Sequence, residues 1–183
     1  MKTRERIVEA AYRCFSEKGY LGATTKEIAH IAGISEVTLF RHFKSKRELF
    51  EEVLKRFSVI PDIERIRAES TLLKGEKLKK VAMEILASLK DKKDFIKILL
   101  SEVPLYEEEV AEIYRGFLEK LDCLIAEILL TDKQTARLFH SSLFGYFLSE
   151  EIFLRREIDE KEAKEVINKL VEIFTGCRNE KNC

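Results

Sequence analysis

The chain has 183 residues, of which 45% are hydrophobic and 36% are charged, and this apolar content excludes general disorder. No apolar run reaches the roughly 18 to 20 residues that a membrane-spanning helix needs. The N-terminal segment is amphipathic and carries acids, unlike a signal peptide. We therefore expect a cytoplasmic protein with no membrane partner.

The net charge of zero conceals an asymmetry along the chain. Residues 1–60 contain 12 Lys or Arg and 8 Asp or Glu, whereas residues 61–183 contain 21 and 25. A basic N-terminal segment followed by an acidic C-terminal segment is typical of a protein whose N-terminal domain binds DNA. The acidic domain is then repelled by the DNA phosphates. The excess is only four charges, so chance is an alternative explanation.

The cysteines and histidines do not indicate a metal site. No cysteine pair has the Cys-x-x-Cys spacing, which favours reduced structural or surface thiols over a redox sensor or a metal site. No two of the three histidines lie at ligand spacing. We predict no metal and no cofactor. The four cysteines are Cys14, Cys123, Cys177 and Cys183.

No catalytic motif stands out in the sequence. It lacks a Gly-rich phosphate loop, a Gly-x-Ser-x-Gly elbow and a His-Glu-x-x-His pair. Ser141 follows His140, but neighbours on a helix point to different faces. We predict that the protein is not an enzyme.

The first predicted element is an amphipathic helix over residues 3–18. Its apolar face contains Ile7, Ala11 and Phe15, which have helical spacing, and Gly19 is expected to end it. Two short helices alone bury too little surface for a stable domain. This helix therefore provides the third wall of a domain over residues 1–45.

Two short helices joined by a tight turn follow. Thr24 or Thr25 can cap the first helix, and Glu27 can complete a capping box. Gly33 can adopt the left-handed conformation that ends a helix, and Ser35 can cap the second helix. The pattern is typical of a helix-turn-helix, whose second helix lies in the DNA major groove.

This stretch resembles the N-terminal domain of the TetR family of transcriptional regulators. Leu39 and Phe43 are expected to face inward. Ile34 and Phe40 match the family pattern conservatively. The residues that match it directly are Thr24, Thr25, Ile28, Ala29, Ala32, Gly33, Ser35, Thr38, Leu39, His42, Phe43, Ser45 and Lys46.

The resemblance implies a set of DNA contacts. Thr25, His42 and Lys46 match positions that contact phosphate, and such contacts fix the register without reading the sequence. Lys26 could reach a base or a phosphate, and Arg41 could pair with guanine or with phosphate.

Three further positions bear on which bases are read. Val37 and Thr38 could touch a thymine methyl group, although Val37 adds bulk where the family commonly has glycine. Phe40 stands where the family usually has tyrosine, so a hydroxyl contact with phosphate is lost while ring packing stays. Glu36 could accept from cytosine N4, but we favour a first-turn glutamate that faces the helix dipole.

The rest of the sequence predicts an all-α fold with about nine helices in total and no strand. Helices are expected at 46–57, 77–90, 95–103, 105–130, 132–156 and 159–176, with helical turns and a loop at 62–74 and a break at Gly75. The acidic run Glu107–Glu109 is expected to be a solvated face, and the tail 177–183 to be frayed.

We expect two domains, a helix-turn-helix DNA-binding domain at 1–45 and a helical effector-binding and dimerisation domain at 46–183. The resemblance implies that helix 46–57 links them and carries the ligand signal. It also implies an effector pocket between middle helices of the body, where aromatic lining favours an apolar or aromatic ligand. For most candidates, plain core or dimer packing is the alternative. The candidates are Met83, Phe95, Leu99, Tyr106, Tyr114, Phe117, Phe144 and Phe147.

The family resemblance further implies that the last two helices pair with those of a second chain. The small residues Ser142, Gly145 and Ser149 form a ridge that would allow close approach. The expected dimer-interface residues are Leu138, Ser142, Gly145, Ser149, Ile152, Val166, Leu170 and Ile173.

Together these observations predict a homodimeric repressor that binds a palindromic double-stranded DNA operator and is released by a small-molecule effector of unknown identity. One alternative is a DNA-binding regulator without an effector. Another is a helical enzyme or protein-binding module that keeps the N-terminal domain as a scaffold; it predicts no salt-dependent DNA binding.

Overall fold

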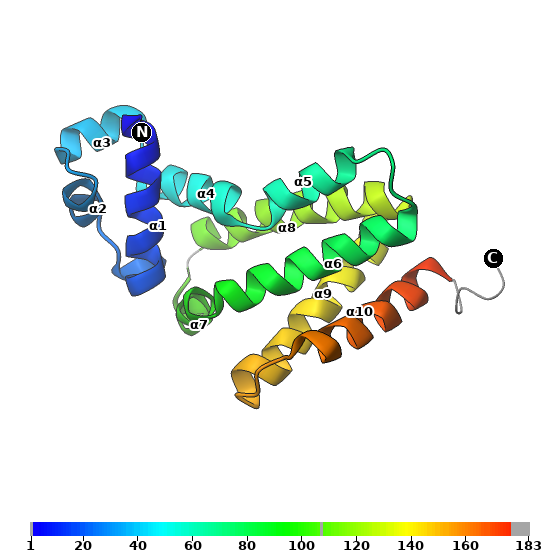
Figure 1. The fold of residues 1–183 in the computed structure, drawn as a ribbon. Coiled ribbons are helices and arrows are strands. Elements are labelled where there is room, and N and C mark those ends of the chain that lie inside the picture. Colours follow the sequence, from blue (N-terminus) through cyan, green and yellow to red (C-terminus); the bar gives the residue numbers. More distant parts are fainter. Residues whose placement is uncertain (1, 107, 177–183) are drawn as a thin grey trace. The chain divides into compact units, whose positions relative to one another are not determined.

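The computed structural model describes residues 2–106 and 108–176, and all regular structure in these ranges is helical (Figure 1). The prediction of an all-α fold is confirmed. The α-helices are α1 (Thr3–Gly22), α2 (Thr25–Ile31), α3 (Glu36–His42), α4 (Lys46–Phe57), α5 (Ile60–Ala68), α6 (Lys74–Asp91), α7 (Lys93–Glu102), α8 (Glu108–Leu129), α9 (Lys133–Phe147) and α10 (Glu160–Thr175). A 3-10 turn, η1 (Val103–Leu105), follows α7, and a π-helix, η2 (Leu148–Phe153), follows α9.

The chain forms two compact units that interleave along the sequence. Unit 1 consists of Met1–Ser58 and Lys92–Phe117, and unit 2 consists of Val59–Asp91 and Leu118–Cys183. Unit 1 thus groups α7 and the first half of α8 with the first four helices, which differs from a division of the chain at residue 45.

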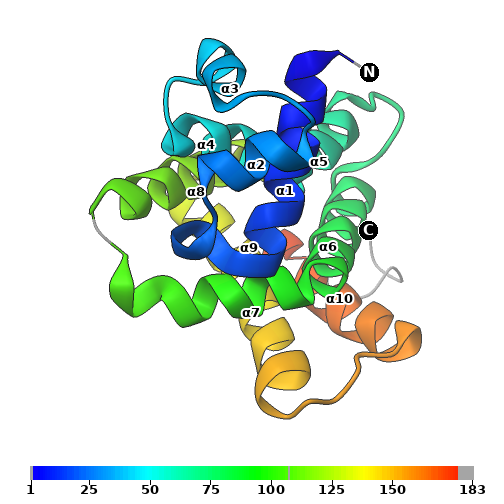
Figure 2. The same ribbon diagram turned by 90° about the vertical axis from the view of Figure 1, so that its left-hand side faces the viewer.

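Unit 1 is built around α1, which packs against α2, α4 and α7. Figure 2 shows α7 crossing the C-terminal end of α1. The core of the unit is aromatic at its centre, where Phe15, Phe43 and Phe50 are fully buried, and Phe15 and Phe50 meet edge to face with their centroids 4.9 Å apart. Burial of such large side chains is the main source of stability for a domain of short helices.

Unit 2 is built around α6, which contacts α5, α9 and α10 (Figure 1). The residues that α6 buries follow helical periodicity: Leu78, Val81, Ala82, Ile85 and Leu86. Helix α9 contributes Phe139 and Phe147 to the core, and both are fully buried.

Three predicted boundaries need correction. Gly75 does not break a helix but lies in the first turn of α6, because the Glu76 carboxylate accepts the Leu73 N–H at 2.9 Å and caps the helix before it. The helical turns predicted within 62–74 are residues 62–68 of α5, and this helix already begins at Ile60. The helix expected at 132–156 ends as an α-helix at Phe147 and continues as η2.

The π-helix contains a buried acidic residue, Glu151. This side chain is 3% exposed, and its carboxylate accepts the N–H of Ile158 at 3.0 Å. The Lys90 ammonium lies 4.0 Å away. A π-helical turn contains about one more residue than an α-helical turn, so it changes the face of the helix on which a side chain lies. Here the π-helical turn contains the buried acidic residue.

Some predictions fall outside the described residues. Glu107, the side chain of Glu109, and the tail 177–183 with Cys177 and Cys183 are among them. Cys14 is a buried free thiol whose pKa burial raises, and Cys123 is a half-buried free thiol. Among the described residues, no helix combines the length and the apolar character that crossing a membrane requires.

Candidate nucleic-acid interface

The turn between α2 and α3 is specified by short-range hydrogen bonds. The Thr24 hydroxyl accepts the Glu27 N–H at 3.2 Å, and the Ser35 hydroxyl accepts the Thr38 N–H at 3.2 Å, so both helices have the predicted side-chain caps. Gly33 between them has φ 65°, a left-handed conformation that other residues adopt at a cost. The caps and the glycine together fix where each helix begins and ends.

Arg6 of α1 holds this turn from the other side. Its guanidinium donates to the carbonyl of Ala32 at 2.9 Å and reaches that of Gly33 at 3.5 Å. The carbonyls of the two residues that follow α2 thereby face a charged donor. Arg6 was not predicted as a functional residue, because its only signal in the sequence is a basic side chain beside the apolar face of the first helix.

The outer face of α3 is open to solvent. Val37 is 66% and Phe40 46% exposed, and Arg41 lies on the same face, four residues after Val37, and is exposed as well. His42 at the end of α3 and Lys26 on α2 are also exposed, while Thr38 is half-buried. Apolar and cationic side chains therefore share a surface on a rigid support, an arrangement suited to base edges and phosphates.

Glu36 is held across the two helices. The Thr25 hydroxyl donates to its carboxylate at 2.6 Å, so Glu36 bridges the start of α2 and the start of α3 rather than only facing the dipole of its own helix. Because the Thr25 hydroxyl has one proton to donate, a hydroxyl contact from Thr25 to phosphate would require this bond to break.

Lys46 is engaged within the protein. Its ammonium donates to the carbonyls of Tyr20 at 2.9 Å and Ala23 at 3.2 Å, and it lies 4.5 Å from the centroid of the Tyr20 ring. A phosphate contact would come in addition to these bonds or in place of them.

The candidate effector residues lie in both units. In unit 1, Phe95 belongs to the core with α1, and Leu99, Tyr106 and Tyr114 pack against it; Phe117 is half-buried. Burial raises the pKa of both tyrosines, that of Tyr114 to about 12, so both remain neutral phenols.

In unit 2, the three remaining effector candidates differ in exposure. Met83 is 49% exposed, whereas Phe147 is fully buried. The rings of Phe144 and Phe147 lie 6.5 Å apart. Phe95 and Phe147 are both buried among the core residues of their units.

The candidate dimer residues gather on α9, η2 and α10 of unit 2. Leu138 and Ile173 are 63% and 64% exposed, and Ser142, Gly145 and Ser149 are exposed too. The half-buried members are Ile152, Val166 and Leu170. Two further apolar residues, Phe153 at 75% and Leu154 at 67% exposed, follow Ile152 and are not among the predicted dimer residues.

A buried charged cluster joins α8 to α9. Asp122 is 1% exposed and accepts from Arg137 and from Nε2 of His140, the latter at 2.7 Å. Burial disfavours the carboxylate, but the hydrogen bonds from Arg137 and His140 outweigh it and hold the pKa of Asp122 below its usual range. The cluster ties the two helices together.

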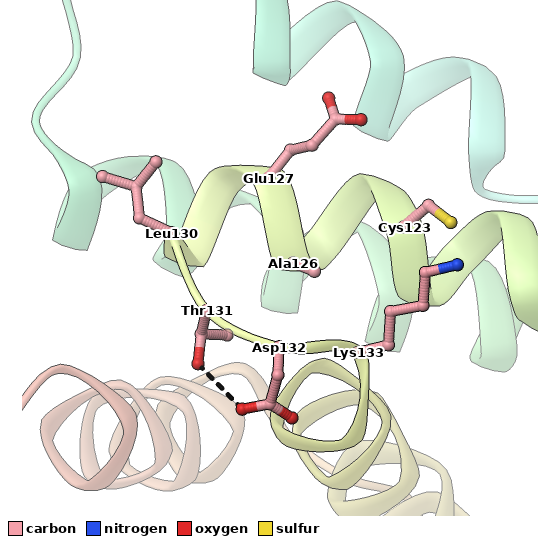
Figure 3. Close-up of a pocket in the computed structure, with 7 residues that line it drawn as sticks. All are labelled: Cys123, Ala126, Glu127, Leu130, Thr131, Asp132 and Lys133. Carbon is pink, nitrogen blue, oxygen red and sulfur yellow. Dashed lines mark hydrogen bonds between the residues drawn. The ribbon is translucent and has the colours of Figure 1, made fainter.

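A shallow hollow lies at the turn between α8 and α9 (Figure 3). Asp132 in its wall caps α9 by accepting the Thr135 N–H at 2.9 Å, and Thr131 donates to the same carboxylate. The hollow contains none of the predicted effector residues. Its lining consists of Cys123, Ala126, Glu127, Leu130, Thr131, Asp132 and Lys133. In the described part of the chain, no group of three His, Cys, Asp or Glu residues is arranged to hold a metal.

Comparison with known proteins agrees with this geometry. The pattern of the bacterial regulatory proteins, tetR family, matches residues 7–53. The HTH-type transcriptional regulator YvkB of Bacillus subtilis, itself uncharacterized, is 31% identical over 157 residues, which cover 80% of this chain and 82% of YvkB. The repressor AcnR of Corynebacterium diphtheriae is 45% identical over 47 residues, covering 26% of this chain and 25% of AcnR.

Solved structures share the fold over nearly the whole chain. The multidrug binding protein EbrR, complexed with imidazole, has a TM-score of 0.60 at 22% identity and covers 93% of this chain and 95% of its own. The fatty acid degradation regulator FadR of Bacillus halodurans has a TM-score of 0.64 at 18% identity, with 96% and 95% covered. The relatives are transcriptional regulators and not enzymes. The match to YvkB along most of both sequences places this chain in the TetR family of helix-turn-helix transcriptional regulators.

Proposed function

We propose that the protein is a homodimeric repressor that binds a palindromic operator and releases it when a small apolar or aromatic effector binds. The observation that carries the proposal is the outer face of α3, where Val37, Phe40 and Arg41 are exposed on a helix that Ser35 caps and that follows a turn bound by Arg6. A rigid support is what base readout requires, because a misplaced side chain loses the directional hydrogen bonds that distinguish bases.

In this proposal α3 of each protomer enters a major groove. The two grooves lie about one helical turn apart, roughly 34 Å, as in other dimeric helix-turn-helix proteins. Arg41 pairs with guanine or phosphate, and Val37 and Thr38 contact thymine methyl groups. The phosphate contacts come from Thr25, His42 and Lys46, and Lys26 contacts a base or a phosphate; the bonds that Thr25 and Lys46 make within the protein compete with their phosphate contacts.

The exposed face of α9 and α10 supports the dimer in the proposal. Leu138 and Ile173 would meet the same face of a second chain, and the small residues Ser142, Gly145 and Ser149 would let the helices approach closely. A side chain at Gly145 would meet no atom within 4 Å in the single chain, so the space above it is open to a partner. The functional division that we propose is a DNA-binding domain at 1–45 and an effector and dimer domain at 46–183.

The effector part of the proposal depends on the apolar candidates. One structural neighbour, EbrR, is a multidrug binding protein, and another, FadR, is a fatty acid degradation regulator. Apolar ligands are therefore the first compounds to test. Coupling between effector and DNA is typically about 1 to 3 kcal/mol and is reciprocal, so the operator would weaken effector binding by the same factor.

The first experiment is selection of bound sequences from random duplex DNA at moderate salt, with an Arg41→Ala protein selected in parallel. The proposal expects an enriched palindrome from the wild type and a relaxed preference at one position of each half-site from the variant. Failure of the wild type to enrich any sequence, with and without added apolar compounds, would contradict the proposal. An enriched palindrome whose affinity no such compound changes would favour the alternative of a regulator without an effector.

A further inference from the structure

Glu102, the last residue of α7, is a buried carboxylate aimed at the end of α1. It is 9% exposed. One carboxylate oxygen accepts the backbone N–H of Tyr20 at 2.8 Å, and the other accepts that of Leu21 at 2.9 Å. The Tyr106 hydroxyl donates to the first of these oxygens at 3.2 Å. A carboxylate out of water is costly unless it is hydrogen-bonded, and here both oxygens are.

The backbone at Gly19 leaves space for the Glu102 carboxylate. Gly19 interrupts α1 with φ 74° and ψ −178°, which turns the next two N–H groups away from the helix ladder. A Cβ atom at residue 19 would lie 2.2 Å from a Glu102 oxygen. Gly19 is therefore required twice, for its left-handed backbone and for the space that Glu102 occupies.

The same peptide segment is held from its other side by α4. Lys46 donates to the carbonyls of Tyr20 and Ala23, so Glu102 binds the N–H of Tyr20 and Lys46 binds its C=O. The Tyr20 ring packs on Phe50 with centroids 4.9 Å apart. The segment Tyr20–Ala23 is thus fixed between an anion from α7 and a cation from α4.

This segment leads directly into the helix-turn-helix. Thr24, the next residue, is the N-cap of α2, and Thr25 is bonded to Glu36 at the start of α3. Hydrogen bonds therefore hold the segment of residues 20–25 at both ends, to Glu102 at the end of α7 and to Glu36 in the first turn of α3, and the covalent backbone connects the two ends. All of these residues belong to unit 1.

We propose that Glu102 is a positioning residue for DNA binding: it holds the segment Tyr20–Ala23, and through it α2 and α3, in the arrangement that reads the operator. The inference rests on the proposed function. The contact of Glu102 also connects α7 to the DNA-binding helices through the backbone of Tyr20–Ala23, in addition to the connection that α4 makes. Any ligand that displaces Tyr106 or the end of α7 acts on Glu102 directly, because the Tyr106 hydroxyl is bonded both to Glu102 and to the Leu99 carbonyl.

The test uses the full-length protein, the selected operator and a duplex of unrelated sequence at the same salt concentration. Glu102→Gln keeps the shape of the side chain, but its amide group sets a donor against one of the two N–H groups. We expect operator affinity to fall about tenfold, the size expected when a hydrogen bond to a charged group is lost, while affinity for unrelated DNA changes by less than about twofold.

The matched control is Asp94→Asn, which removes the same charge from the exposed start of α7, where Asp94 is 88% exposed. Loss of a negative charge strengthens attraction to DNA, so a charge effect alone would tighten binding by Glu102→Gln and by the control alike. The predicted weakening has the opposite sign. Operator affinity equal to or tighter than that of the wild type in a folded Glu102→Gln protein would overturn the inference.

A second measurement uses only the wild-type protein and so tests the inference even when the Glu102→Gln protein fails to fold. Amide hydrogen exchange of the wild-type protein should show Tyr20 and Leu21 protected in the free protein and exchanging at least about threefold more slowly when the operator is bound. Rapid exchange of both amides, or no change with operator, would overturn the inference. Failure of the wild type to select an operator would instead remove the proposed function, so the two failures are distinguishable.

Discussion

The outer face of α3 and the outer face of α9 and α10 both expose large apolar side chains, yet their surroundings differ. Val37 and Phe40 on α3 share a surface with exposed Arg41, His42 and Lys26. Leu138 on α9 accompanies the small uncharged residues Ser142, Gly145 and Ser149 instead. An apolar patch beside the cationic side chains of Arg41 and Lys26 suits a partner that presents both methyl groups and phosphates, whereas an apolar patch with small residues suits a second apolar helix.

The two faces also differ in how they are supported. The α2–α3 pair buries little surface of its own and depends on hydrogen bonds at defined positions, such as those of Ser35 and Arg6. Helices α9 and α10 each pack on α6 over several turns. The first face should therefore be sensitive to single polar contacts, and the second to changes in apolar area.

The largest expected effect comes from a charge on the α10 face. In the proposed dimer, Ile173→Asp should separate the two chains and weaken operator binding about 100-fold or more, because two linked DNA contacts become one. Molecular mass in solution and operator titration would measure it. Asn168→Asp adds the same charge at an exposed position of the same helix and should leave the dimer intact. A dimeric Ile173→Asp protein with full affinity would remove this face from the dimer.

The second-largest effect should come from loss of the hydrogen bonds that Arg6 makes to the turn between α2 and α3. Arg6→Ala should lower the free energy of unfolding by about 2 kcal/mol, since the carbonyl at Ala32 loses a charged donor. Urea denaturation would measure the change. Arg13→Ala removes an exposed arginine from the same helix and should cost much less; equal losses in the two variants would mean that these hydrogen bonds contribute little.

A base contact by Arg41 should have an effect confined to one operator position. Arg41→Ala should lose about 1 to 3 kcal/mol of discrimination there. Lys26→Ala is the comparison: a phosphate contact by Lys26 predicts that its loss weakens all sequences alike and reduces the salt dependence of binding, whereas a base contact predicts a change at one position. Competition binding with operators substituted one base pair at a time would separate the two. An unchanged base preference would exclude Arg41 from readout.

The smallest effect concerns acid stability in unit 2. The pKa of Asp122 is lowered in the folded protein, so its pairing contributes stability that is present above the usual carboxyl pKa and is lost as pH falls through the folded value. The difference in unfolding free energy between the wild type and Asp122→Asn should therefore narrow between about pH 5 and pH 3. A difference that stays constant over that range would show that another interaction of Asp122 dominates.

The sequence by itself determined the features that are encoded within one or two helical turns. The caps at Thr24 and Ser35, the left-handed Gly33 and the inward Leu39 and Phe43 are all where the sequence predicted them. Each depends on residues three or four positions apart, so the local pattern suffices. The family followed from the same short stretch and was confirmed by the relatives.

Only the tertiary structure decided the contacts between distant residues. Glu102 meets Tyr20 across 82 positions, and Arg6 meets Ala32 across 26. Neither pair has a sequence signature, because a hydrogen bond between separate helices depends on how those helices pack. The buried pairing of Asp122 with His140 and the π-turn at Glu151 are of the same kind. A buried polar group acquires its partner only when the surrounding helices have excluded water from it.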